Sequence, residues 1–210
     1  MSFLLKGAGG FVFGFAVIYA LWRLLLARRP LALDAPTIWL YMGLAFPICI
    51  VSEVLIGRLH FELFGAQLWQ YRVAPTHGGY TSLYNFAIWP LYGWHVYLGE
   101  QALARWNPSA GLRRAVLLLK HASAGPLLEI IANLGMLAIL GRYYFYYLPG
   151  DLWHLTSIQV VPYYFVLSLL FSAFIARVRD TQHKLAIGCV GYLAGLAFLF
   201  LAGLAFLFLA

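Results

Sequence analysis

Residues 37–58 read TIWLYMGLAFPICIVSEVLIGR, an apolar run that ends at Arg58 and carries one carboxylate, Glu53. A helix needs roughly 20 apolar residues to cross the hydrocarbon core of a bilayer, and this run is long enough. Similar runs fall near residues 8–27, 81–104, 122–140, 158–176 and 185–209. The pattern predicts an all-α, polytopic integral membrane helix bundle of about six transmembrane helices.

The composition agrees with a membrane chain. Of its 210 residues, 63% are hydrophobic, 18% aromatic and 10% charged, whereas a soluble domain is about half apolar and about a quarter charged. This excludes a soluble enzyme and a disordered chain. We expect a single membrane domain over 1–210, in five parts: the first helix and a cytoplasmic loop at 1–36, repeat unit 1 at 37–104, a cytoplasmic loop at 105–121, repeat unit 2 at 122–176 and the last helix at 177–210.

Lys and Arg residues are unevenly distributed between the two sides of the predicted bundle. One side carries ten and the other four: Arg23, Arg28, Arg29, Arg105, Arg113, Arg114, Lys120, Arg177, Arg179 and Lys184, against Lys6, Arg58, Arg72 and Arg142. Positive residues stay preferentially in the cytoplasm. The expected location is therefore a bacterial inner membrane, with both termini on the periplasmic side.

An internal repeat emerges when Glu53 is aligned with Glu129. The same register then matches three further pairs without a gap: Gly65 with Gly141, Tyr71 with Tyr147 and Thr81 with Ser157. Both units would run from the cytoplasm to the outside and back, so the copies would be parallel repeats related by an axis along the membrane normal. The alternative is a chance match of aromatic residues in a chain that has many.

Several polar residues lie inside or next to the apolar runs. A carboxylate near the bilayer centre costs about 2.5–3.5 kcal/mol, so Glu53 and Glu129 should face the interior, a cavity or a partner. Asn133 follows Glu129 at i+4 and shares its helix face. The candidate ligand-binding residues are Glu53, Asn85, Trp89, His95, Glu129, Asn133, Trp69, Tyr71 and Arg72. The alternative is that the two carboxyls only fasten helices together.

The outer loops carry groups that could act in acid–base chemistry. His77 lies in one loop, and Asp151 and His154 lie in the other. Together with the glutamates they give the catalytic candidates Glu53, Glu129, His77, His154 and Asp151. The alternative is a solvated polar rim.

Metal and nucleotide chemistry find no support in the spacing of residues. No two of the six histidines stand at i, i+3 or i, i+4, and Cys49 and Cys189 both lie within apolar runs. No phosphate-binding motif occurs. We expect no metal, no cofactor and neither nucleotide nor nucleic acid as a partner.

Three short motifs stand out between residues 62 and 93: ELFGAQLWQYR at 62–72, Gly78-Gly79, and NFAIWPLYG at 85–93. They resemble the CmpB-type small polytopic membrane proteins, a family described as an ABC-transporter component. Gln70 stands where that family has Asp before the tyrosine. The later GRYY at 141–144 and VVP at 160–162 are similar to bacterial carotenoid hydratase-like membrane proteins. No catalytic residue is carried over from either family.

These features lead to three hypotheses of function. In the first, the bundle binds a lipid or isoprenoid-like molecule in an outward-facing polar and aromatic cavity, as part of a membrane assembly that includes other membrane subunits. In the second, it is an intramembrane enzyme acting on a lipid or polyene. In the third, it is a structural subunit of a larger membrane complex. Whether the chain is an enzyme stays open at this point.

Overall fold

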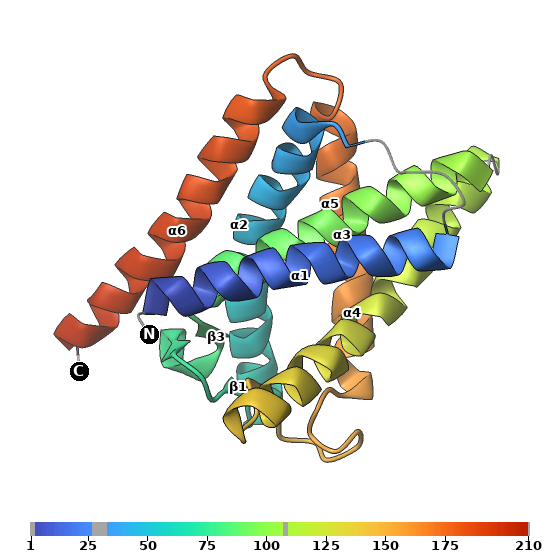
Figure 1. Cartoon of the computed structure of the whole chain (residues 1–210). Coiled ribbons are helices and arrows are strands. Elements are labelled where there is room, and N and C mark those ends of the chain that lie inside the picture. The colour runs from blue at the N-terminus through green and yellow to red at the C-terminus, as the bar shows by residue number, and fades with distance from the viewer. Residues whose placement is uncertain (1–2, 27–32, 107–108, 210) are drawn as a thin grey trace. The chain divides into compact units, whose positions relative to one another are not determined.

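The computed structural model describes residues 3–26, 33–106 and 109–209 of the chain. This described part is mostly helical and contains six α-helices: α1 Phe3–Leu26, α2 Ala35–Phe64, α3 Asn85–Trp106, α4 Ala110–Leu140, α5 Val161–Val178 and α6 Lys184–Leu209 (Figure 1). The remaining elements are the strands β1 Trp69–Tyr71, β2 Pro75–Thr76, β3 Thr81–Ser82 and β4 Phe145–Tyr147, and the 3₁₀ turns η1 His77–Gly79 and η2 Ile158–Val160. The all-α prediction is confirmed.

Two helices of the described chain are long and apolar enough to cross a membrane. They are Ala35–Phe64, and Ile158–Val178 when η2 is counted with α5. Shorter apolar helical stretches occur at Val12–Leu24 and Lys184–Phe200. The number of membrane spans predicted from the sequence, six, therefore stays a prediction.

The cytoplasmic loop predicted at 105–121 is wrong in extent, because α4 already begins at Ala110. The prediction used the charges at Arg113, Arg114 and Lys120 to mark a loop. Arg and Lys are good helix formers, however, and neighbouring Leu and Ala residues continue the helix. The side chains of Arg105, Arg113 and Arg114 lie outside the described residues, as do the segment with Arg28 and Arg29 and the side chain of Lys6.

The chain divides into two compact units, each assembled from distant segments. We call the first the helix unit; it consists of Met1–Ile48, Tyr84–Leu117 and Phe171–Leu196. The second, the connection unit, consists of Cys49–Leu83, Leu118–Leu170 and Ala197–Ala210.

In the helix unit, α1 packs along α3 (Figure 1). The rings of Phe15 and Trp94 stack with centroids 4.3 Å apart, and Trp94 Nε1 donates to the Phe15 carbonyl oxygen at 3.2 Å. About two turns further along α1, Trp22 Nε1 donates to His95 Nδ1 at 3.1 Å. Aromatic rings with a polar edge thus join the two helices.

Glycines bring α2 and α6 into backbone contact in the same unit. A Cβ atom placed on Gly43 would lie 2.0 Å from the carbonyl oxygen of Gly188, and one on Gly191 would lie 2.7 Å from that of Gly43. Only a residue without a Cβ fits at such an approach. Small residues at helix contacts are typical of bundles in membranes.

Two segments link helix pairs, here called the first connection (residues 65–84) and the second connection (residues 141–160). Both lie in the connection unit except for Tyr84, the last residue of the first connection. Each begins at a glycine with positive φ, +70° at Gly65 and +65° at Gly141. Their N–H groups donate to Phe61 and Leu137 carbonyls at 2.8 and 3.0 Å. This is the left-handed cap that ends many helices, and it stops α2 and α4 in the same way.

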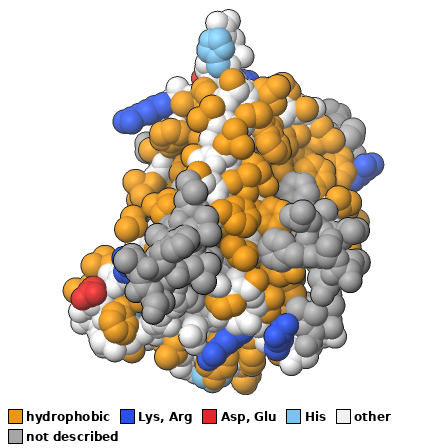
Figure 2. All heavy atoms as spheres, turned by 90° about the vertical axis from the view of Figure 1, so that its left-hand side faces the viewer, with side chains coloured by type: hydrophobic (Ala, Val, Ile, Leu, Met, Phe, Trp, Pro, Cys, Tyr) orange, Lys and Arg blue, Asp and Glu red, His pale blue; other side chains and the backbone are white. Residues whose placement is uncertain are grey.

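Many large apolar side chains are exposed. Leu127 on α4, Leu170 on α5 and Leu193 on α6 expose 60%, 57% and 63% of their surfaces. Hydrophobic side chains cover most of the described surface on the face drawn in Figure 2. Apolar surface on this scale marks contact with a membrane or with other proteins.

Candidate functional site

The carboxylate of Glu129 receives hydrogen bonds from three hydroxyl groups within the connection unit. Tyr147 Oη donates to Oε1 at 2.7 Å and Tyr164 Oη donates to the same oxygen at 2.8 Å. Thr156 Oγ1 donates to Oε2. Donors therefore come from β4, from α5 and from the end of the second connection, so Glu129 ties all three segments to α4.

Glu53 has the corresponding arrangement with the first connection. Tyr71 Oη donates to Glu53 Oε1, and the two residues are 18 positions apart, as are Glu129 and Tyr147. Glu53 is 9% exposed. Both glutamates thus bind a tyrosine from the strand that follows their own helix.

The two tyrosines belong to one antiparallel ribbon. β1 pairs with β4 in a register that places Trp69 opposite Tyr147, Gln70 opposite Tyr146 and Tyr71 opposite Phe145. Side chains two residues apart share a face of a strand, so Tyr71 and Tyr147 lie on the same, buried face of the ribbon. Burial, followed by the negative charge of Glu129, raises the pKa of Tyr147 well above its usual value, and Tyr71 and Glu53 add to the shift. Tyr147 is therefore a hydrogen-bond donor at all physiological pH values.

A shift of 76 residues relates the boundaries of the two halves. It carries the end of α2 onto the end of α4, β1 onto β4 and the start of α3 onto the start of α5. Two hydrogen bonds that flank the ribbon correspond in the same way: Arg72 N donates to Tyr144 O at 2.8 Å, and Leu148 N donates to Leu68 O at 3.0 Å. The strand pairing is therefore symmetric about its central pair, Gln70 and Tyr146.

Asn133 holds the second connection against α4. Its Oδ1 accepts from Tyr144 N at 3.0 Å and from Phe145 N at 3.3 Å, and its Nδ2 donates to Leu155 O at 2.8 Å. Asn133 has no exposed surface. Its amide satisfies backbone groups that would otherwise be buried without partners, which is the fastening role considered for this helix face.

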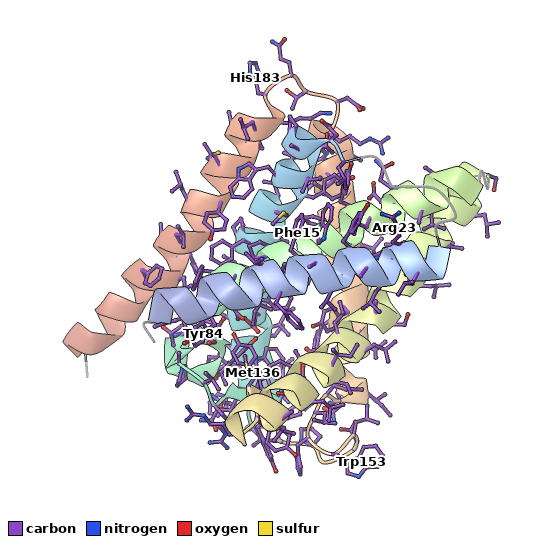
Figure 3. All side chains as sticks on the ribbon, in the orientation of Figure 1. Phe15, Arg23, Tyr84, Met136, Trp153 and His183 are labelled. Atoms are coloured by element: carbon purple, nitrogen blue, oxygen red, sulfur yellow. The ribbon has the colours of Figure 1, made fainter. Side chains whose placement is uncertain are left out.

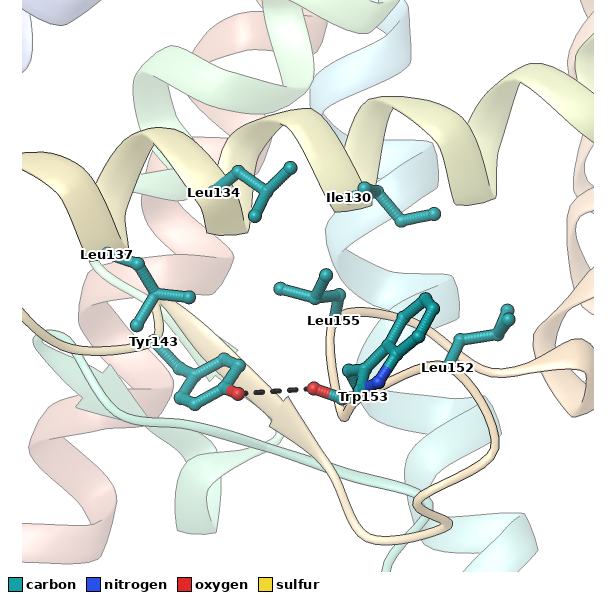
Figure 4. Close-up of a pocket in the computed structure, with 7 residues that line it drawn as sticks. All are labelled: Ile130, Leu134, Leu137, Tyr143, Leu152, Trp153 and Leu155. Atoms are coloured by element: carbon teal, nitrogen blue, oxygen red, sulfur yellow. Dashed lines mark hydrogen bonds between the residues drawn. The ribbon is translucent and has the colours of Figure 1, made fainter.

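A pocket of about 490 Å³ lies between α4 and the second connection. Ile130, Leu134 and Leu137 line it from α4, and Tyr143, Leu152, Trp153 and Leu155 line it from the connection (Figure 4). Tyr143 Oη donates to Trp153 O at 3.1 Å across the connection. No charged residue is among the residues that line the pocket. The pocket therefore suits an apolar, uncharged molecule.

Two consecutive residues at this pocket have left-handed backbone conformations. Trp153 has φ +51° and His154 has φ +61°, a conformation that is unfavourable for side chains of this size. His154 Nδ1 donates to Tyr147 O at 2.6 Å, and the His154 ring stacks on Tyr146 at 4.2 Å. These contacts hold Trp153, which is 79% exposed, at the turn of the connection (Figure 3).

In the first connection, His77 has a left-handed backbone conformation like that of Trp153. It has φ +52° and is 7% exposed, and its ring stacks on Phe198 of α6 at 4.9 Å with 9° between the planes. Burial lowers the pKa of His77. The imidazole is therefore neutral near pH 7.

The sequence-predicted site residues fall into both compact units. Most lie in the connection unit: Glu53, Trp69, Tyr71, Arg72, Glu129 and Asn133, with the catalytic candidates His77, Asp151 and His154. Asn85, Trp89 and His95 belong to the helix unit. Asp151 accepts from Ser157 Oγ at 3.0 Å and from Ile158 N at 2.8 Å, and the Arg72 guanidinium lies 5.5 Å from the centre of the Tyr146 ring. Among the described residues, no three His, Cys, Asp or Glu side chains are grouped to hold a metal ion.

Sequence reasoning missed Thr156 and Tyr164 as partners of Glu129, and it missed the pocket. Tyr164 lies 35 residues from Glu129, and no local periodicity links positions so far apart. The pocket residues are mostly leucines, with one isoleucine, and such residues look the same in sequence whether they pack or line a cavity. The sequence does align Tyr71 with Tyr147, the tyrosines that bond to Glu53 and Glu129, but it does not predict the strands that carry them.

Comparison of the chain with protein-family models, with curated proteins and with solved structures finds no match.

Proposed function

We propose that this chain is an integral membrane protein of six spans built from a duplicated helix–connection–helix module, located in a bacterial inner membrane with both termini outside. The two helices long enough to span a bilayer, the exposed apolar side chains and the excess of Lys and Arg on one side support this proposal. The common shift of 76 residues in helix ends, strands and flanking hydrogen bonds supports the duplication.

The proposed function is to bind the apolar chain of a lipid or isoprenoid-like molecule in the pocket beneath the second connection. The observation that carries this proposal is the pocket itself, about 490 Å³ with an apolar lining and no charged residue. Ligand pockets usually measure roughly 300–1,000 Å³ and are lined mainly by hydrophobic and aromatic side chains. Membrane lipids and other membrane subunits are the expected partners.

In this proposal Glu53, Glu129 and Asn133 build the site rather than touch the ligand. Glu129 and Asn133 lie on α4 next to pocket residues, and their side chains are hydrogen-bonded to β4 and to other residues of the second connection. By fixing β4 and Leu155 against α4, they hold the wall of the pocket in place. Such support of a binding site by neighbouring hydrogen bonds keeps its geometry constant.

Mass spectrometry of molecules retained after gentle detergent purification tests the proposal. The native chain should retain a hydrophobic molecule at about one per chain. Leu134→Phe adds volume inside the pocket and should lower retention at least tenfold. Leu127→Phe is the matched control, because Leu127 is on the same helix, is 60% exposed and does not line the pocket. Equal retention in both variants, or no retained molecule in the native chain, would contradict the proposed function.

A further inference from the structure

The turn of the first connection corresponds to the turn of the second connection that borders the pocket, and in the first connection this turn is covered by another part of the chain. The shift of 76 residues places His77 on Trp153 and Gly78 on His154. The backbone agrees, with φ +52° and +70° in the first connection and +51° and +61° in the second. Three of these four residues are not glycine, and non-glycine residues seldom adopt a positive φ, so the two turns match locally.

The two corresponding side chains differ in what lies over them. The His77 ring is stacked under Phe198 of α6, nearly parallel to it, and only 7% of the residue is exposed. No ring of the described residues stacks on Trp153, which is 79% exposed. At this position of the first connection, the apolar helix α6 places the planar ring of Phe198 on His77. The second connection has the larger ring of Trp153 at the same position, and that ring is exposed.

We propose that the ligand of the pocket is a neutral lipid with a planar ring, such as an isoprenoid quinone, whose ring stacks on Trp153 as Phe198 stacks on His77. This inference rests on the proposed function and names the class of its ligand. The isoprenoid chain occupies the apolar part of the pocket, over Leu134 and Leu137.

Two further observations distinguish this ligand from a phospholipid. No charged residue lines the pocket, so an anionic headgroup would have no partner there. Trp153 Nε1 donates to none of the described residues, and the indole N–H can donate to a quinone carbonyl. The His154 bond to Tyr147 and the Tyr143 bond to the Trp153 carbonyl oxygen fix the backbone that carries the indole, so little ordering is required when the ring binds.

Binding of a short-chain isoprenoid benzoquinone to the purified full chain, measured by equilibrium titration with quenching of tryptophan fluorescence, tests the proposal. A diacylglycerol of similar size is the comparison ligand. Trp153→Leu keeps an apolar side chain but removes the ring, and should weaken quinone binding roughly tenfold while leaving diacylglycerol binding within twofold. Trp153→Phe keeps a ring without the N–H and should weaken quinone binding less. Trp39→Phe, in the helix unit, is the control and should change neither affinity.

The outcomes separate this inference from the proposed function. Quinone binding that is unchanged in Trp153→Leu, or diacylglycerol binding as tightly as quinone to the native chain, would overturn the ring-bearing ligand and leave the lipid pocket standing. Failure of the native chain to bind either ligand would overturn both. A fold control is the unfolding temperature, which should be the same in the native chain and in all three variants to within a few degrees.

Discussion

Asn133 is the residue on which the second connection depends most directly. Asn133→Leu would leave the N–H groups of Tyr144 and Phe145 without their acceptor. Each buried unpaired group costs about 1–3 kcal/mol, so we expect a loss of unfolding free energy on the order of 3 kcal/mol. Ser123→Ala on the same helix is the control and should change it by less than about 0.5 kcal/mol, because Ser123 is exposed and bonds only to its own helix. Similar stabilities would contradict the fastening role.

Two substitutions of Glu129 test whether the charge of this side chain or its shape matters for stability. Glu129→Gln keeps an oxygen that can accept from Tyr147 and Tyr164, so the loss should be about 1 kcal/mol or less, in line with the roughly 0.6 kcal/mol average for hydrogen bonds in membranes. Glu129→Leu removes every acceptor and should cost clearly more. Because Glu129 does not line the pocket, Glu129→Gln should also retain the bound molecule. Normal folding with loss of that molecule would instead place the carboxylate in the binding site.

His77 makes the first connection sensitive to acid. Burial lowers its pKa in the folded chain, below the value of about 6.5 expected in the unfolded chain. The unfolded state therefore binds the proton more readily, and stability should be fully present above about pH 6.5 and fall as the pH drops toward the folded pKa. In the variant His77→Asn, the asparagine tolerates the positive φ and carries no titrating group. Unfolding temperatures measured between pH 8 and pH 5 should show a smaller acid-induced drop in this variant, and an equal drop would contradict the assignment.

Among the helices, the contact of α2 with α6 has the tightest requirement. Gly43→Ala would place a Cβ 2.0 Å from the Gly188 carbonyl oxygen, and the helices must separate to admit it. We expect a loss of several kcal/mol, as in overpacked cores. Gly135→Ala on α4 is the matched control, because nothing lies within 4 Å of its Cβ position; alanine should there be neutral or stabilise by up to about 1 kcal/mol. Unfolding temperatures in detergent decide between these results, and equal effects would contradict the close approach.

The sequence predicts the helices but not the short strands, for a physical reason. The predicted apolar runs are much longer than ordinary strands, a length that favours helices, and all six runs overlap an observed helix. The start of α4 was missed because Arg and Lys were read as loop residues although both favour helices. β1 and β4 have three residues each, too few for a periodic pattern, and their pairing joins segments 76 residues apart. The alignment of Tyr71 with Tyr147 marks matching positions of the two segments, but it predicts neither a strand nor a pairing, and the ribbon places Tyr71 opposite Phe145.

On the scale of the whole molecule, the sequence predicted which residues carry the polar network but not where a ligand would fit. The sequence singles out Glu53, Glu129 and Asn133 because polar groups in apolar runs require partners. It singles out Tyr71 as an aromatic residue of an outer loop that aligns with Tyr147. The pocket depends on how leucines of α4 face the second connection, which follows from the Asn133 bonds and the left-handed turn at Trp153. Neither can be derived from the local sequence.

Cysteine labelling in intact bacterial cells tests the membrane arrangement most directly. In a chain whose Cys49 and Cys189 are replaced by alanine, Arg142→Cys places a thiol on the second connection and Asp180→Cys places one between α5 and α6; both positions are exposed. The account predicts that a membrane-impermeant thiol reagent labels position 142 in intact cells and labels position 180 only after the membrane is permeabilised. Labelling of 180 but not 142 would invert the orientation, and labelling of both in intact cells would contradict a membrane between them.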